Sequence, residues 1–146
     1  MKNVRDILYS KGDATTYSIG PDAMVVDALK LMAEKMVGAL LVLEQGKLVG
    51  IFSERDYSRK IALMDRSSRS TSIRQVMTGN LISVSPSDTM ESCMELMTEK
   101  RIRHLPVLEN GQLIGIISIG DLVKNIIEDQ KAMILQLEKY MRGESY

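Results

Sequence analysis

The chain has 146 residues, of which 45% are hydrophobic and 26% charged, a composition typical of one folded, domain-sized unit. Its 19 basic and 19 acidic side chains cancel to a formal net charge of zero, which argues against a general binder of nucleic acid or anionic membranes. A single cysteine excludes an internal disulfide, and a single histidine excludes the usual zinc ligand sets. No run approaches the roughly 20 apolar residues that span a bilayer, and the start lacks a secretory signal, so we expect a cytoplasmic protein. From the single cysteine and the single histidine we expect no metal site.

The first elements alternate between helix and strand. Residues 4–8 predict a short helical turn, and residues 15–19 have the threonine, tyrosine and isoleucine content of a short strand. Pro21 then marks a helix start, and apolar residues at helical spacing predict an amphipathic helix to about Met36. Gly38 is expected to end this helix.

A hairpin and a helix complete the first half of the chain. Residues 39–43 and 48–52 are apolar runs joined by a turn that contains Gly46. Their near-continuous hydrophobicity predicts two strands covered on both faces. Ser53 then opens a helix that includes residues 56–63.

The second half repeats this order at a constant offset of 65 residues, without a gap. The sequence LPVLENGQLIGIISIGD from Leu105 matches LLVLEQGKLVGIFSERD from Leu40. A repeat this short cannot bury its own apolar face, so we expect an α/β (α+β) protein of two pseudo-symmetric β-α-β-β-α repeats packed into one body with a shared cleft. The elements predicted for the second copy are a helical turn at 73–77, a strand at 81–84, a helix at 88–101, strands at 105–108 and 112–117, and a helix from about Gly120.

These patterns divide the chain into repeat 1 (residues 4–66), repeat 2 (residues 73–129) and a C-terminal helical extension (residues 130–146). A polar linker over residues 65–72 joins the repeats. The extension continues an apolar stripe with the 3, 4, 3, 4 spacing of a coiled coil, which either docks on its own body or pairs with another chain. The stripe consists of Ile127, Gln130, Ile134, Leu137 and Met141.

Each repeat ends its last strand with a Ser-x-x-Asp motif, Ser53 with Asp56 and Ser118 with Asp121. Such a pair can simply cap a helix, because the serine oxygen accepts an orphan N–H and the carboxylate favours the positive end of the helix dipole. The same geometry offers backbone N–H groups to a phosphate and a carboxylate to the two hydroxyls of a ribose. Both interpretations stay open from the pattern alone.

The double repeat, with Gly-Ile-(Phe/Ile)-Ser-x-x-Asp closing each copy, resembles a tandem pair of cystathionine-β-synthase (CBS) domains, the Bateman module. The resemblance covers residues 4–129 and includes Arg103-His104-Leu105-Pro106-Val107 and Ser53-Glu54-Arg55-Asp56-Tyr57, forms seen in stand-alone CBS-pair proteins of bacteria and plant mitochondria. It implies up to two sites in the inter-repeat cleft for AMP, ADP, ATP, NAD or S-adenosylmethionine, with AMP as our first expectation.

The resemblance also assigns roles to individual residues. Because Arg55 faces Gly120 in the alignment of the repeats, and Arg103-His104 faces Gly38-Ala39, we expect one strong site and one weak or empty site. The implied contacts are Asp56 and Asp121 with ribose hydroxyls, Ser53 and Ser118 with ribose or phosphate, Gly38, Ala39, Leu40, His104, Leu105 and Pro106 with adenine through their backbone, Ser18 and Ser83 on the opposite wall, and Arg55, Arg103 and His104 with phosphate.

Two functions are compatible with these observations. The first is a regulatory sensor that binds an adenine nucleotide and signals in trans to a partner protein; the second is a dimeric interaction protein without a physiological nucleotide. The sequence contains no Ser/His/Asp, Cys/His or paired-acid constellation, so we do not expect an enzyme. Cys93, which matches Ala28 of the first repeat, is expected to be a buried small hydrophobe. We expect a homodimer, since CBS pairs associate through their helical faces.

Overall fold

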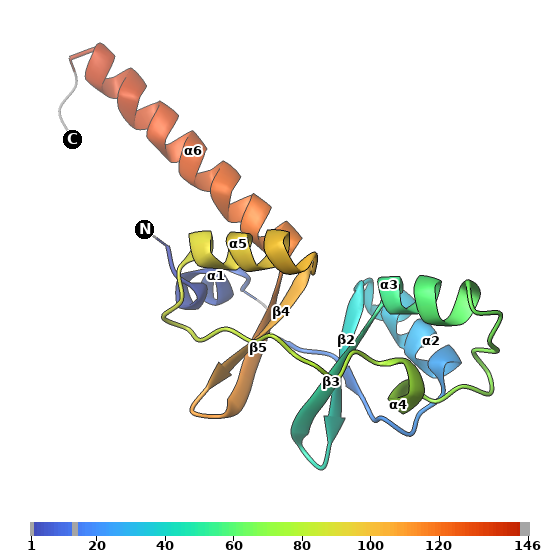
Figure 1. Cartoon of the computed structure of the whole chain (residues 1–146). Coiled ribbons are helices and arrows are strands. Elements are labelled where there is room, and N and C mark those ends of the chain that lie inside the picture. The colour runs from blue at the N-terminus through green and yellow to red at the C-terminus, as the bar shows by residue number, and fades with distance from the viewer. Residues whose placement is uncertain (1, 13–14, 144–146) are drawn as a thin grey trace. The chain divides into compact units, whose positions relative to one another are not determined.

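A computed structural model describes residues 2–12 and 15–143 of the chain (Figure 1). It forms two compact units. Residues 15–83 make up one, and residues 84–143 make up the other together with the N-terminal segment 2–12. The repeat boundaries drawn from the sequence stay predictions, but the spatial units show that the short helix preceding each repeat packs with the other repeat.

The unit of residues 15–83 contains one three-stranded sheet, in the order β1-β2-β3. β1 runs parallel to β2, and β2 forms the predicted antiparallel hairpin with β3. All four residues from Ala39 to Val42 are buried, as the near-continuous apolar run predicted. The elements of this unit are β1 (Ser18–Ile19), α2 (Val25–Lys35), β2 (Ala39–Glu44), β3 (Lys47–Ser53), α3 (Glu54–Asp56), the π-helix η1 (Tyr57–Ala62) and α4 (Ile73–Val76).

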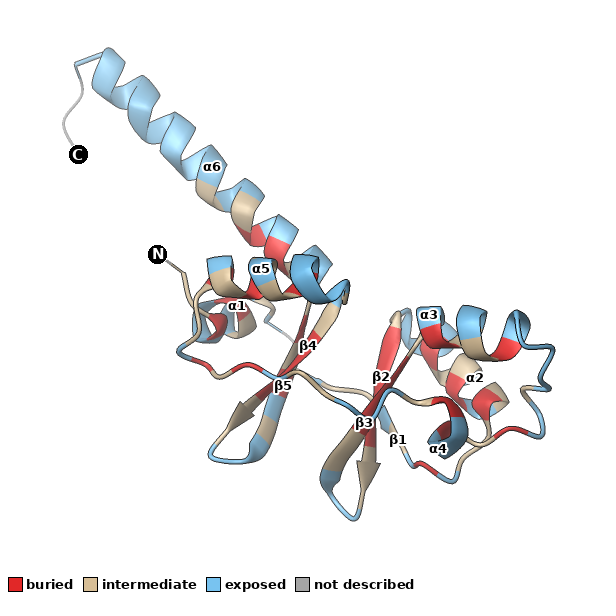
Figure 2. Cartoon of the chain, viewed as in Figure 1, coloured by how far each residue is buried: buried red, intermediate tan, exposed pale blue. Residues whose placement is uncertain are grey.

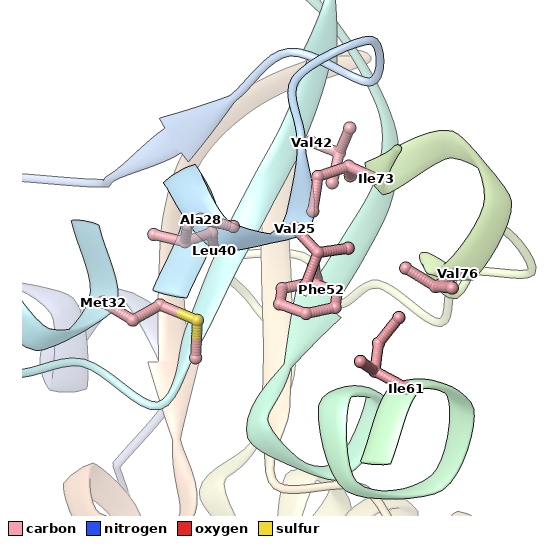
Figure 3. Packing of buried hydrophobic residues seen from close by; sticks show 9 residues of the cluster. All are labelled: Val25, Ala28, Met32, Leu40, Val42, Phe52, Ile61, Ile73 and Val76. Atoms are coloured by element: carbon pink, nitrogen blue, oxygen red, sulfur yellow. The ribbon is translucent and has the colours of Figure 1, made fainter. Parts of the chain in front are cut away.

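The core of this unit lies between its sheet and its helices (Figure 3). Phe52 on β3 is fully buried and is the only phenylalanine of the chain. Three of the residues at helical spacing that predicted α2, Val25, Ala28 and Met32, form its buried face, which confirms the amphipathic pattern. Leu29 is half-buried, and Met36, which was expected on the same face, is 91% exposed because the helix ends before it. The cluster consists of Val25, Ala28 and Met32 from α2, Leu40, Val42 and Phe52 from the sheet, Ile61 from η1, and Ile73 and Val76 from α4.

The end of α2 differs from the sequence-based expectation. The helix ends at Lys35, and Met36 takes the left-handed conformation at φ 56° where Gly38 was expected to terminate it. The backbone N–H groups of Met36 and Val37 both donate to the carbonyl oxygen of Met32. This carbonyl in the last turn of the helix therefore has hydrogen-bond partners at the cap. Arg101 repeats this geometry at φ 55° at the end of α5 (Met90–Lys100), so the unusual cap belongs to both repeats.

The second unit holds a two-stranded sheet of β4 (His104–Glu109) and β5 (Gln112–Ser118), with α1 (Val4–Ser10), α5 and α6 (Ile119–Met141). The strand predicted at residues 81–84 is wrong, because only Val84 pairs, in a single parallel bridge with Val107. The sequence offers the physical reason. In the first unit the N–H of Leu41 donates to the carbonyl of Tyr17, and the residue equivalent to Leu41 is Pro106, which has no N–H to donate.

The two short helices dock on their units in the same way. The N–H of Val4, at the start of α1, donates to the carbonyl of Asp88 over 2.8 Å, and the N–H of Ile73, at the start of α4, donates to that of Ala23 over 2.9 Å. Both side chains are fully buried. Each short helix thereby closes the core of its unit. Within the described residues, no helix has the length and apolar character needed to cross a bilayer.

Candidate functional site

The first Ser-x-x-Asp motif lies where β3 passes into α3. Ser53 is the N-cap of α3, and its cross-strand partner is Ala39 at the start of β2. The carbonyl of Gly38 accepts the N–H of Glu54 over 3.1 Å. The structure therefore brings four of the sequence-predicted site residues to one end of the hairpin, Gly38, Ala39, Ser53 and Asp56.

The Asp56 carboxylate is buried and occupied on both oxygens. Its Oδ2 accepts the N–H of Ser53 at 3.0 Å and the hydroxyl of the same residue at 3.1 Å. Its Oδ1 accepts the hydroxyl of Thr78 at 3.0 Å and lies 3.1 Å from Nζ of Lys60. The sequence reasoning missed Thr78 and Lys60; the spacing of four residues between Asp56 and Lys60 on a helix was the signal for the second. At this junction the capping contacts occupy Oδ2, and the side chains of Thr78 and Lys60 occupy Oδ1.

The second motif lies where β5 passes into α6, and its carboxylate is less occupied. Oδ2 of Asp121 accepts the N–H of Ser118 at 2.8 Å and lies 2.9 Å from Nζ of Lys11. The N–H of Asp121 in turn donates to Oγ of Ser118 over 3.2 Å. The contacts from Ser118 and Lys11 both fall on Oδ2 of Asp121, whereas the contacts to Asp56 are divided between its two oxygens. The side chain is 20% exposed, against 11% for Asp56.

A polar cavity of about 110 Å³ adjoins Asp121 and is lined by Ser10, Lys11, Asp121, Lys124 and Asn125. Asn125, which is 2% exposed, stands where repeat 1 has Lys60. Its Oδ1 accepts Nζ of Lys2 at 2.9 Å, and its Nδ2 donates to the carbonyl of Asp121. The cation at this carboxylate therefore comes from the N-terminal segment. The cavity can hold a polar group of a ligand, but a whole nucleotide needs a larger pocket of about 300 Å³ or more.

The remaining predicted site residues take different positions. Arg103 and His104 lie at the start of β4, beside the second motif, because the carbonyl of Arg103 accepts the N–H of Ile119 and His104 pairs with Ser118. Leu40, Leu105 and Pro106 are buried, and their contact with adenine stays a prediction. Ser18 is exposed on β1, Ser83 is exposed outside any strand, and Arg55 is exposed on α3.

Cys93 is fully buried on α5, as its match with Ala28 predicted. Burial, with a smaller contribution from the charge of Asp88, raises the pKa of the thiol to about 11. Because the thiolate is the reactive form, we expect Cys93 in the folded protein to react at least tenfold more slowly with Ellman's reagent at pH 8 than in the unfolded chain. Equal rates with and without denaturant would contradict this. Within the part of the chain that the structure describes, no group of three or more His, Cys, Asp or Glu side chains gathers to hold a metal ion.

Comparison with known proteins agrees with this architecture. The sequence model of the CBS domain matches residues 4–63 and again residues 73–128. The CBS domain-containing protein CBSX3, mitochondrial, from Arabidopsis thaliana is 39% identical over 96% of this chain and 72% of its own length. A solved putative signal-transduction protein with CBS domains from Burkholderia ambifaria is 50% identical, with a TM-score of 0.85 over 88% of this chain and 96% of its own.

A more distant CBS domain pair, solved with 5-methylthioadenosine and S-adenosyl-L-methionine, shares the fold at a TM-score of 0.77. It is 21% identical, and the match covers 88% of this chain and 98% of that one. The double match to one domain, the mixed α/β repeats and the identity to stand-alone CBS proteins all agree. The chain belongs to the CBS domain family, in which it is a tandem pair of CBS repeats.

Proposed function

We propose that this protein is a regulatory sensor that binds an adenosine-containing nucleotide, with AMP as the first candidate and ADP, ATP and NAD as the others. The observation that carries the proposal is the carboxylate of Asp121. It lies at a helix N-terminus beside a polar cavity, and its contacts with Ser118 and Lys11 both fall on Oδ2. Such a carboxylate can accept hydrogen bonds from the two vicinal hydroxyls of a ribose.

The ligand class has a second support. The distant CBS pair described above was solved with two adenosine-containing molecules. Of the two Ser-x-x-Asp motifs, we propose that the one at Asp121 forms the stronger site, since both oxygens of Asp56 are already bonded. Lys11 and Lys124 line the cavity and supply positive charge for a phosphate. The placement of the nucleotide between the two repeats stays a prediction from the sequence.

The regulatory role follows from the family, whose stand-alone members carry names such as signal-transduction protein. We propose that occupancy is signalled in trans to a partner protein, which requires the nucleotide to favour one conformation or assembly over another. We also propose a homodimer in the cytoplasm. Assembly occurs among similar proteins, since a CBS-CP12 protein that is 30% identical is described as hexameric.

The first test identifies the ligand directly. Native mass spectrometry of the purified protein, followed by denaturation and analysis of the released small molecules, should show an adenosine compound at a defined ratio to the chain. If no nucleotide is carried over and calorimetry with AMP, ADP, ATP and NAD at millimolar concentration shows no binding, the second function remains, a dimeric interaction protein without a physiological nucleotide.

The second test concerns the carboxylate. Asp121→Asn should weaken AMP binding by about 1.5–3 kcal/mol, roughly ten- to a hundredfold, because hydrogen bonds to a charged acceptor are replaced by weaker ones. Isothermal titration calorimetry measures the change. Glu128→Gln is the matched control, since it removes an exposed carboxylate from the same helix. Unchanged AMP affinity in Asp121→Asn would leave Asp121 only its capping role.

A further inference from the structure

The second half of α6 leaves the unit to which its first turns are anchored. Leu122 and Asn125 are buried, and Nζ of Lys2 lies 3.0 Å from Oδ1 of Asp129. From residue 130 to residue 143 every residue is exposed (Figure 2). A helical segment of this length is marginal in water without packing. Its apolar face is therefore a surface that needs a partner.

This face has the pattern of a coiled-coil core. Ile134, Leu137 and Met141 are 56%, 54% and 84% exposed, and together they continue a row whose spacing is 4, 3, 4, 3, 4. One flank of the row is apolar, and the other carries Lys124, Lys131 and Glu138. We call the row the seam; it consists of Val123, Ile127, Gln130, Ile134, Leu137 and Met141.

We propose that the seam of α6 binds the seam of a second copy in antiparallel orientation, about a twofold axis beside residue 132. The inference specifies the contact within the proposed self-association. Because Lys124 also lines the cavity of the proposed nucleotide site, the tests below use protein without added nucleotide. The seam residues are spaced symmetrically on either side of residue 132, at distances of two, five and nine residues. Reversing one helix about this point therefore places each seam residue against a seam residue of the partner. Ile127 then packs on the partner's Leu137, and Gln130 packs on the partner's Ile134. Such an interface is isologous and closes as a dimer contact.

The charged flank selects the antiparallel orientation. Reversing one helix brings this flank against the same flank of the partner, so that Lys124 faces the partner's Glu138, twice per dimer by symmetry. A parallel pair would instead place this flank against the apolar flank, which consists of Ile126, Met133 and Tyr140. In that arrangement no opposite charges meet. The antiparallel register has one unfavourable contact, because Lys131 of one chain faces the partner's Lys131. This pair of like charges lies at the solvated edge of the interface, where its cost is small.

Within one helix Lys124 and Glu138 cannot meet, because fourteen residues separate them by about 21 Å along the axis. A charge swap between these two positions therefore tests a contact between chains. We expect sedimentation of the full chain over a concentration series to show self-association. Lys124→Glu and Glu138→Lys should each weaken it about tenfold, because each creates two like-charge contacts. The double variant Lys124→Glu/Glu138→Lys should return to within about threefold of the original dissociation constant.

Two further variants distinguish the loss of the contact between chains from the loss of the fold. Ile134→Asp should abolish the self-association, whereas Lys139→Glu, on the side of the helix away from the seam, should leave it unchanged. Circular dichroism checks that each variant keeps its helix content. A monomeric original chain, self-association that survives Ile134→Asp, or a charge swap that fails to restore the affinity would each overturn the proposal.

A cross-linking experiment reads the orientation directly. Lys131→Cys should form a disulfide-linked dimer on mild oxidation, because an antiparallel pair brings this position against its own copy. Lys139→Cys is the control, equally exposed on α6 but turned away from the seam, and it should cross-link at least tenfold more slowly. The native Cys93 is buried and does not compete. Equal cross-linking rates would overturn the antiparallel register, whatever the result of the nucleotide titrations.

Discussion

Asp56→Ala is expected to lower the free energy of unfolding by about 2–3 kcal/mol. This is the range expected when a charged acceptor is removed and its buried donors lose their hydrogen-bond partner. The substitution removes the acceptor for Ser53, Thr78 and Lys60 together. These three residues join β3, the segment after α4, and η1. Loss of the carboxylate therefore loosens three segments of the unit and also removes the cap at the start of α3.

Urea unfolding followed by circular dichroism measures the change. The matched control is Asp121→Ala at the equivalent position of the other repeat, where the carboxylate is more exposed and its bonds reach one oxygen. We expect this control to lose about half as much stability and to lose far more nucleotide affinity. Equal unfolding midpoints for the two variants would show that the additional bonds of Asp56 contribute no net stability.

Gly50→Ala is expected to destabilise the fold by about 1–3 kcal/mol through overpacking. A Cβ atom at Gly50 would lie 2.6 Å from Sδ of Met77 and 3.1 Å from the carbonyl oxygen of Thr78. The methionine side chain can move. The carbonyl cannot move freely, since the backbones of Thr78 and Ile51 exchange hydrogen bonds of 3.0 and 2.8 Å. Space at Gly50 is thus what lets the segment after α4 approach β3.

Thermal unfolding monitored by circular dichroism tests this, with Gly20→Ala as the control. A Cβ atom at Gly20 meets no atom within 4 Å among the described residues, and its φ is not positive, so we expect a change within about 0.5 kcal/mol. Gly115→Ala at the equivalent position of the other repeat should fall between the two, because its clash at 2.8 Å is with the flexible end of Leu8. Equal melting temperatures for Gly50→Ala and Gly20→Ala would contradict the argument.

Much of the fold could be predicted from the sequence because it depends on local periodicity. The apolar spacing in α2 and the two runs around Gly46 are properties of neighbouring residues, and both elements form as predicted. The repeat offset of 65 residues identified equivalent positions without any structure. The missing strand before Val84 also had a signal in the sequence, although it lies on the partner strand: Pro106 stands where the first repeat has Leu41 and cannot donate the pairing N–H.

The different environments of Asp56 and Asp121 depended on the tertiary structure. The two motifs have the same Ser-x-x-Asp pattern and the same capping geometry, so the sequence treats them as equals. What separates them is the side chains that arrive from distant segments. Thr78 is 22 residues from Asp56, and Lys11 is 110 residues from Asp121. A carboxylate takes its role from the donors that packing brings to it, and no spacing within the motif encodes those donors.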